Sequence, residues 1–302
     1  MSLTLFLCVC MISLSCFHES VFADPTPVVM WHGMGDTCCN LGSLGAIINV
    51  LQREIPGIYV LSLRFGKSAT EDIENSYFGN INKQISDVCN QLANDEHLQN
   101  GYHAIGRAVA QRCPSPPMRN YISIGGQHQG SKLCNFARML LNYGAYYVSC
   151  EHFSVIQAQY WHDPLHENTY RDKSIFLAEI NNEKVLNQTY IENLQKLQNM
   201  VMIKFTRDSM VVPPESSWFG FYAPGQAVDV IPLKETELYK NQNKFIKCHT
   251  LTIDAFLKRL PHQRMGDFFF PYYLGYTTMK AQAACQNKSG NEGKKLLDLD
   301  QG

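Results

Sequence analysis

Residues 27–36 read PVVMWHGMGD, a short apolar run that passes into a turn rich in glycine. This pattern is typical of a buried strand that ends where the backbone bends sharply. A helix is indicated next by four apolar residues at helical spacing, Leu44, Ile47, Ile48 and Leu51. A second β-rich run then covers Ile58 to Leu63. A strand, a helix and a second strand in this order predict the opening of a parallel sheet.

The same alternation continues along the chain. Ile81 to Leu92 repeats apolar residues at the helical period, and the strand-like run from Gly101 to Gly106 passes into a helical segment at Arg107 to Arg112. Tyr121 to Ile124 and Met200 to Phe205 have the composition of further buried strands. We therefore predict a doubly wound α/β fold with a mainly parallel sheet.

Polar residues follow three of these strands: His32, His128 in the turn from Gly125 to Gly130, and Asp208. In open parallel sheets, functional residues gather beyond the carboxyl ends of the strands. The sequence thus predicts a site at this edge of the sheet. Taken singly, His32 is more often a structural histidine, and Asp208 has the alternative of an ordinary turn aspartate.

Charge and chain ends limit the classes of function. With 26 Lys and Arg against 27 Asp and Glu, the net charge is -1, so the charge does not indicate a protein that binds nucleic acid. The apolar stretch from Leu3 to Leu14 is shorter than the roughly 20 residues of a membrane span, and small residues follow it. We expect residues 1–23 to be a signal peptide, with a signal anchor as the alternative. Residues 24–239 then form one domain, and 240–302 a divergent segment with a disordered end.

The cysteines and two N-glycosylation sequons agree with a protein of the secretory pathway. Removal of the signal would leave eight of the 11 cysteines in an oxidising compartment, where disulfides persist. Asn187 and Asn287 begin sequons for N-glycosylation. No cluster of His and Cys has the spacing of metal ligands, and we expect no metal and no cofactor.

Six runs within residues 25–239 resemble lysosomal palmitoyl-protein thioesterases. They are VVMWHGMGDTCC (28–39), IPGIYVLSL (55–63), AVAQRCPSPPM (108–118), IGGQHQG (124–130), AQYWHDP (158–164) and WFGFY (218–222). The resemblance implies an α/β-hydrolase fold and the removal of S-linked palmitate from the cysteines of acylated proteins, without a cofactor. It also implies a Ser, Asp, His triad in that chain order and an address in the lysosome, or secretion.

The resemblance assigns two roles in the chemistry. Asp208, which precedes a serine as in the family, matches the acid that orients the catalytic histidine. The backbone amide of Met34 matches the first donor to the oxyanion that forms on the thioester.

The resemblance also implies disulfide pairs. Cys38 and Cys39 match a vicinal pair, and Cys89 and Cys113 match a second bridge. Cys134 matches half of a third bridge, whose partner falls in a loop that this chain lacks.

The chain departs from the family where the nucleophile should lie. In the family, Gly-x-Ser-x-Gly joins the strand matching 102–105 to the following helix, but here Gly106 joins Arg107 directly, so that about eight residues are missing. No other Gly-x-Ser-x-Gly occurs in the chain. Neither Ser115, between prolines, nor Ser131 has the small flanking residues of such a turn. His249 and His262 have the chain order of the base, but neither has a matching context, and we assign no base.

Two hypotheses of function follow. The first is a lysosomal thioesterase acting on S-acylated proteins, whose functional form contains the missing segment. The alternative is a catalytically inactive variant that binds acyl groups or does not fold. The sequence does not determine the oligomeric state.

Overall fold

The computed structural model describes residues 24–105, 107–131, 155–236 and 239, and the backbone of two further strands at 248–258 and 273–282. The predicted signal peptide at 1–23 and the end of the chain lie outside these residues. The longest described helix has 14 residues, and no helix in this part of the chain is long and apolar enough to span a bilayer.

A seven-stranded sheet forms the centre of the molecule, in the order β2-β1-β3-β4-β5-β8-β9. All neighbours are parallel except β8 and β9. The strands are β1 (Val28–Met30), β2 (Val60–Ser62), β3 (Tyr102–Ile105), β4 (Met118–Ile124), β5 (Asn199–Phe205), β8 (Cys248–Lys258) and β9 (Tyr273–Gln282). This order is the mainly parallel sheet of an α/β-hydrolase fold, as expected from the sequence.

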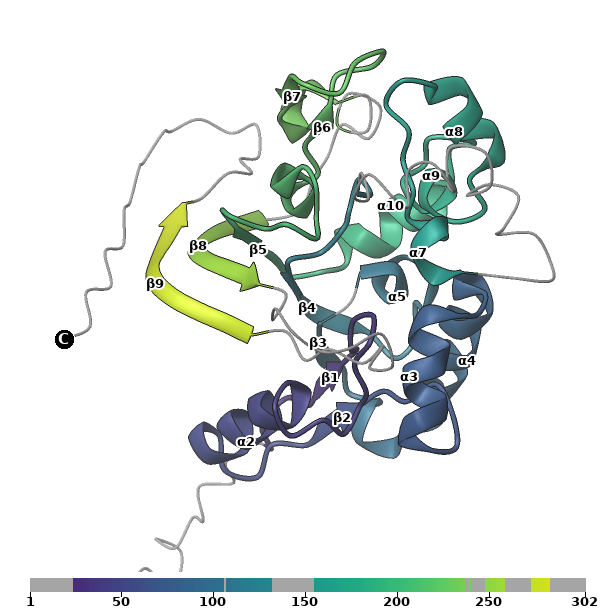
Figure 1. Ribbon diagram of the computed structural model, residues 1–302. Coiled ribbons are helices and arrows are strands. Elements are labelled where there is room, and N and C mark those ends of the chain that lie inside the picture. The colour runs from purple at the N-terminus through teal and green to yellow at the C-terminus, as the bar shows by residue number, and fades with distance from the viewer. Residues whose placement is uncertain are drawn as a thin grey trace, which may run out of the picture.

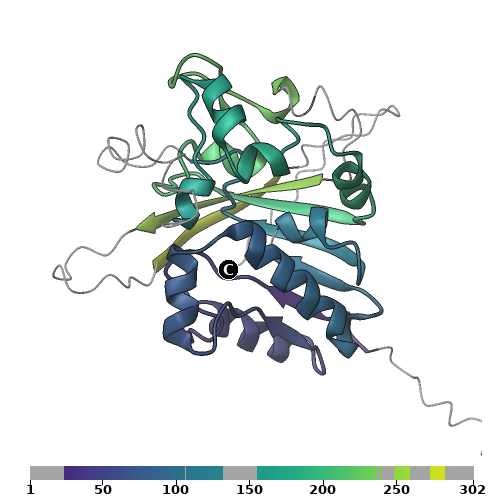
Figure 2. The same cartoon turned by 90° about the vertical axis from the view of Figure 1, so that its right-hand side faces the viewer.

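Helices cover both faces of the sheet. Figure 1 shows α2 (Leu44–Glu54) on one side of β1 and β2, and α3 (Ala69–Tyr77) and α4 (Ile81–Asn94) on the other. Figure 2 shows α3 and α4 in front of the strands. The predicted periodicity is confirmed in α4, whose buried residues are Ile81, Ile85, Val88 and Leu92. Asn80 caps this helix, because its side chain accepts hydrogen bonds from the amides of Asn82 and Lys83.

Several short elements lie between β4 and β8 in the sequence, on either side of β5, and Figure 1 shows them at the top and the upper right of the view. They are α7 (Ile156–Gln159), α8 (Glu167–Lys173), α9 (Leu177–Ile180), α10 (Gln188–Gln195), η2 (Pro214–Trp218), β6 (Phe221–Tyr222), β7 (Val230–Ile231) and η3 (Leu233–Glu235). The sequence patterns do not predict these helices, because none exceeds eight residues and a helical period needs more turns to be visible.

Two further helices flank β3 in the sequence. η1 (Glu96–Leu98) precedes β3, and α5 (Arg107–Arg112) follows it with residue 106 alone between them. Strand limits differ a little from the prediction: β4 begins at Met118 rather than Tyr121, while β2 spans only the middle of the expected run. Burial of Met118 and Tyr121 in the main core explains the longer strand.

Candidate active site

The carboxyl edge of the parallel sheet gathers three turns. Because β1, β3, β4 and β5 are neighbouring parallel strands, the turns after β1, β4 and β5 lie at the same edge. His32, His128 and Asp208 belong to these three turns, and all three are buried. The predicted location of the polar residues is therefore confirmed.

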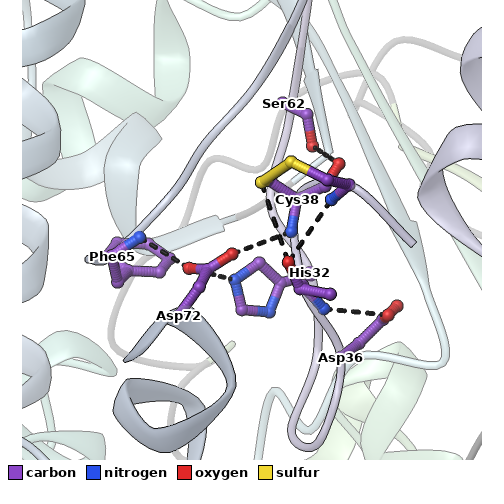
Figure 3. The surroundings of a disulfide bond; sticks show 8 residues. His32, Asp36, Cys38, Ser62, Phe65 and Asp72 are labelled. Atoms are coloured by element: carbon purple, nitrogen blue, oxygen red, sulfur yellow. Dashed lines mark hydrogen bonds and ion pairs between the residues drawn. A yellow bond between two sulfur atoms is a disulfide. The ribbon is translucent and has the colours of Figure 1, made fainter. Parts of the chain in front are cut away.

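One carboxylate, that of Asp72 in α3, fixes the turn after β1. Its Oδ1 receives the ring Nε2 of His32 at 3.0 Å and the amide of Phe65 at 2.6 Å. Its Oδ2 receives the amide of Cys38 at 2.9 Å (Figure 3). Burial alone would raise the pKa of Asp72, but the two amides and His32 outweigh it and lower the pKa below its ordinary value. Asp72 is thus a buried charge with partners on both oxygens.

Both ring nitrogens of His32 face oxygen acceptors. Nδ1 lies 3.0 Å from the carbonyl of Gly33, and Nε2 lies 3.0 Å from the Asp72 carboxylate. A general base needs a nitrogen lone pair directed at the proton that it removes. His32 therefore orders the turn and does not present a base to a substrate.

Met34 lies at the tip of this turn and is partly exposed. The next residue, Gly35, has a φ of +77°, and a Cβ there would lie 2.5 Å from the hydroxyl of Tyr77. The amide of Gly35 donates to the Ser76 hydroxyl at 2.8 Å. Glycine is required at this position because of both the backbone angle and the contact. The turn thereby places the Met34 amide at the carboxyl edge of the sheet.

Asp208 lies in the turn after β5 and is 7% exposed. Its Oδ1 accepts the amides of Met210 at 2.8 Å and Val211 at 3.0 Å. Its buried Oδ2 has no hydrogen-bond partner among the described residues. Burial raises the pKa of Asp208, although the amides of Val211 and Met210 oppose the change. Within the described part of the chain, one oxygen of this carboxylate is thus left without a donor.

A cavity of about 210 Å³ lies beside the turns after β1 and β4. Its apolar lining comes from sequence-distant elements: Trp31, Ile81, Tyr160, Phe176, Leu177 and Ile180. Its polar lining includes His32, Ser123 and His128. The hydroxyl of Ser123, in β4, lies 2.7 Å from Nε2 of His128. The cavity therefore combines apolar walls with a serine and a histidine in hydrogen-bond contact.

The link between β3 and α5 contains no candidate nucleophile, since one residue separates the strand from the helix. The two serines considered from the sequence lie in other settings. Ser115 is exposed and precedes β4, at the opposite edge of the sheet. Ser131 is buried, donates to the carbonyl of Met210 at 2.8 Å and accepts the amide of Val212 at 3.0 Å. Ser131 thus joins two turns of the backbone.

The two histidines with the chain order of the base are not placed in the site. His249 belongs to β8, opposite Val201 of β5, and only the backbone of that strand is described. His262 lies outside the described residues, as do Cys134 and Asn287. Within the described part of the chain, no group of three or more His, Cys, Asp and Glu residues could bind a metal ion.

The described part of the chain contains two disulfide bonds, Cys38 to Cys39 and Cys89 to Cys113. The second joins α4 to the end of α5, with Cα atoms 5.2 Å apart. Asn187 is the N-cap of α10: its Oδ1 accepts the amide of Thr189 at 3.0 Å. This cap uses the oxygen and leaves the amide nitrogen, the atom that carries a glycan, outside the contact. Glycosylation of Asn187 stays a prediction.

Sequence reasoning missed Asp72 and Ser123. Asp72 lies in the acidic stretch TEDIEN of α3, a pattern that indicates a solvated helix face. Its role depends on residues up to 40 positions away, which no local pattern reveals. Ser123 had a visible signal, because the pair Gly125 and Gly126 lets the chain reverse and bring His128 back toward the strand.

Comparisons with known proteins identify relatives of the whole domain. Residues 27–246 match the family described as palmitoyl protein thioesterase. The chain is 46% identical over 296 residues to palmitoyl-protein thioesterase 1 of Caenorhabditis elegans, covering 89% of this chain and 98% of that protein. It is 35% identical over 227 residues to palmitoyl-protein thioesterase 3 of Dictyostelium discoideum, covering 70% and 76%.

Proposed function

This chain belongs to the palmitoyl protein thioesterase family, and we propose that it hydrolyses the thioester that joins a palmitoyl group to a cysteine of an acylated protein. The observation behind the proposal is the family match over residues 27–246, which includes the turn after β1, the cavity and Asp208. Hydrolysis of a thioester needs a nucleophile, a base and oxyanion donors, but no metal or cofactor.

The cavity supports an acyl substrate. Aromatic and aliphatic side chains line it, and the polar groups are confined to a few positions. Its volume of about 210 Å³ is below the roughly 300 Å³ at which small-molecule sites begin, so it suits the thioester and the adjoining carbons better than a whole palmitoyl chain.

We propose Asp208 as the acid of the site and the Met34 amide as an oxyanion donor. The Oδ2 of Asp208, which has no partner among the described residues, supports the first role, because an orienting carboxylate needs one oxygen for the histidine that it positions. The bend at Gly35 supports the second role, because Met34 precedes it in the turn after β1, at the carboxyl edge of the sheet where oxyanion donors are needed.

The second candidate is an inactive acyl-binding variant, and the absence of Gly-x-Ser-x-Gly favours it. The relatives named above favour the hydrolase instead. Activity and binding separate the two. Purified chain is incubated with a palmitoyl-cysteine peptide, and released palmitate is measured together with binding of the peptide by fluorescence anisotropy.

In the form with a strand-to-helix segment restored between residues 106 and 107, we expect palmitate release that is lower by at least about a hundredfold in Asp208→Asn, which retains the shape of the side chain but removes its charge. Restoration of a strand-to-helix segment between residues 106 and 107 provides the positive control. Saturable binding without release by the chain as it stands would support the inactive variant, and neither binding nor release would reject both functions.

The two disulfide bonds agree with a protein of the secretory pathway. Within that pathway we propose the lysosome as the place of action and S-acylated proteins undergoing degradation as the substrates. Immunofluorescence against a lysosomal membrane marker tests the location.

A further inference from the structure

The hydroxyl of Ser123 and the ring of His128 form the contact that nucleophilic catalysis requires. The Oγ to Nε2 distance of 2.7 Å is within the range at which a histidine can remove a serine proton. Both residues line the cavity, and Ser123 is 3% and His128 6% exposed. The pair is therefore shielded from bulk water but adjacent to the space available for a ligand.

The ring of His128 has a fixed orientation. It stacks on Phe219 with ring centroids 4.5 Å apart and planes 11° apart, and it meets the ring of Tyr121 in a T-shaped contact with centroids 6.3 Å apart. The backbone is fixed as well, because Asn181 donates to the carbonyl of His128 at 2.9 Å. A base that is oriented in advance loses little conformational entropy when it acts.

Gly126 provides the space in which the pair meets. A Cβ at this position would lie 2.4 Å from Oγ of Ser123 and 2.8 Å from Cε1 of His128. Any side chain at residue 126 would push the two groups apart. The close approach of the hydroxyl and the ring thus depends on glycine at this position.

The other described histidines lack such a contact. His32 faces a carboxylate and a carbonyl, and His162 likewise faces Glu167 and the carbonyl of Gln129. Two more, His97 and His166, meet aspartates at the surface, and His103 meets the side-chain amide of Asn120. Within the part of the chain that the structure describes, His128 alone places a ring nitrogen against a serine hydroxyl.

We propose that Ser123 and His128 act as nucleophile and base in this chain, with an acyl thioester as substrate. The inference rests on the proposed function for the identity of the acyl group, but not for the pair itself. It supplies the hydroxyl that the chain lacks between β3 and α5.

The reaction proceeds in two balanced steps. Oγ of Ser123 attacks the thioester carbonyl while its proton passes to Nε2 of His128, and the C–S bond breaks as that proton moves to the departing sulfur. The products are an acyl ester on Ser123 and a free cysteine thiol. Water then attacks the ester, His128 takes its proton and returns it to Oγ, and the fatty acid leaves. Gly126 and Gln127 line the same cavity, and the amides of such a turn are the usual type of oxyanion donor.

A fluorophosphonate probe tests the pair without any acyl substrate, because it modifies activated serines covalently. The purified full chain is treated with the probe, and the labelled peptide is identified by mass spectrometry. Three variants accompany it: Ser123→Ala, His128→Phe, which retains a ring against Phe219, and Ser217→Ala. Ser217 is a matched control, since it is fully buried and its hydroxyl has no partner among the described residues.

We expect labelling of Ser123 that is lost in Ser123→Ala, is slower by at least about a hundredfold in His128→Phe, and is unchanged in Ser217→Ala. Near-ultraviolet circular dichroism establishes that each variant is folded. Absence of label on Ser123 in folded wild type, or equal labelling in His128→Phe, would overturn the proposal.

Parallel assays with the palmitoyl-cysteine peptide separate this inference from the proposed function. Palmitate release without label on Ser123 would retain the thioesterase and reject the pair. Label on Ser123 with neither binding nor hydrolysis of the peptide would retain the pair and reject palmitoyl thioesters as the substrate.

Discussion

Asp72 and Asp208 are both buried aspartates beside the carboxyl edge of one sheet, and their surroundings are opposite. Asp72 accepts two amides and an imidazole, which occupy both of its oxygens, and its pKa lies below the ordinary value. Among the described residues, Asp208 has donors on one oxygen only, the amides of Met210 and Val211, and burial raises its pKa.

This difference in hydrogen bonding distinguishes a carboxylate that stabilises the fold from one that can take part in a reaction. A buried charge whose hydrogen bonds are complete stabilises the fold and has no capacity for another partner. A buried charge with an empty oxygen costs stability unless a further donor arrives. Buried carboxyls with a raised pKa are typical of functional sites, and the contrast between the two aspartates can be tested by experiment.

Removal of Asp72, whose carboxylate accepts hydrogen bonds on both oxygens, should have the largest effect on stability. Asp72→Ala leaves the His32 ring and the amides of Cys38 and Phe65 buried without an acceptor, and we expect a loss of about 3 to 5 kcal/mol in the free energy of unfolding. Urea denaturation measures it. Asp87→Ala, at an exposed position of α4, is the control and should change stability by less than about 0.5 kcal/mol. A similar small loss in both variants would contradict the structural role of Asp72.

Removal of the Asp208 carboxylate should reduce the free energy of unfolding by less. Asp208→Ala deprives the Met210 and Val211 amides of their acceptor, and we expect a loss of about 1 to 3 kcal/mol. Asp208→Asn retains that oxygen and removes the buried charge, so its stability at neutral pH should equal or exceed that of the wild type. Thermal and urea unfolding compare the two variants, and a less stable Asp208→Asn would show that Oδ2 has a partner in the folded protein.

The pH dependence of stability should differ in sign between the two sites. The lowered pKa of Asp72 gives stability that is present above its ordinary pKa and lost as the pH falls through the folded value. The raised pKa of Asp208 gives stability that is present below its ordinary pKa and lost as the pH rises through the folded value. Unfolding free energies of wild type, Asp72→Asn and Asp208→Asn across the acid range should therefore give differences with opposite slopes.

The vicinal disulfide should contribute least. Cys38 donates its amide to Asp72, but its bond to Cys39 closes no loop beyond adjacent residues, so Cys39→Ala should cost about 1 kcal/mol or less. Loss of the bond between Cys89 and Cys113, which are 24 positions apart, should cost about 3 kcal/mol and serves as the reference. If Cys39→Ala destabilised the protein as much as Asp72→Ala, the disulfide rather than the carboxylate would fix the turn.

Local patterns predicted the elements whose own residues determine them. The apolar period of α4 and the runs of β1, β3, β4 and β5 are visible in the sequence because each element buries one stripe or both faces. The position of Asp208 followed from the same reasoning, since a residue after a parallel strand must lie at the carboxyl edge.

The rest depends on contacts between distant segments. The walls of the cavity come from the residues after β1, from α4, from β4 and from the short helices, and no periodicity relates them. The state of each aspartate is likewise set by which amides reach it, so that two residues of one type acquire opposite pKa shifts. The sequence identifies candidate residues for such a site, but only the folded structure determines how many hydrogen bonds each of them accepts.

The three contacts of Asp72 also bear on the order in which the protein assembles. They reach His32, Cys38 and Phe65, at separations of 40, 34 and 7 positions, and join β1, the residues after β2 and α3. Contacts so distant along the chain form only when the intervening loops close. The turn bearing the Met34 amide therefore cannot take its shape as an isolated fragment: it becomes ordered cooperatively, when α3 docks on the nascent sheet.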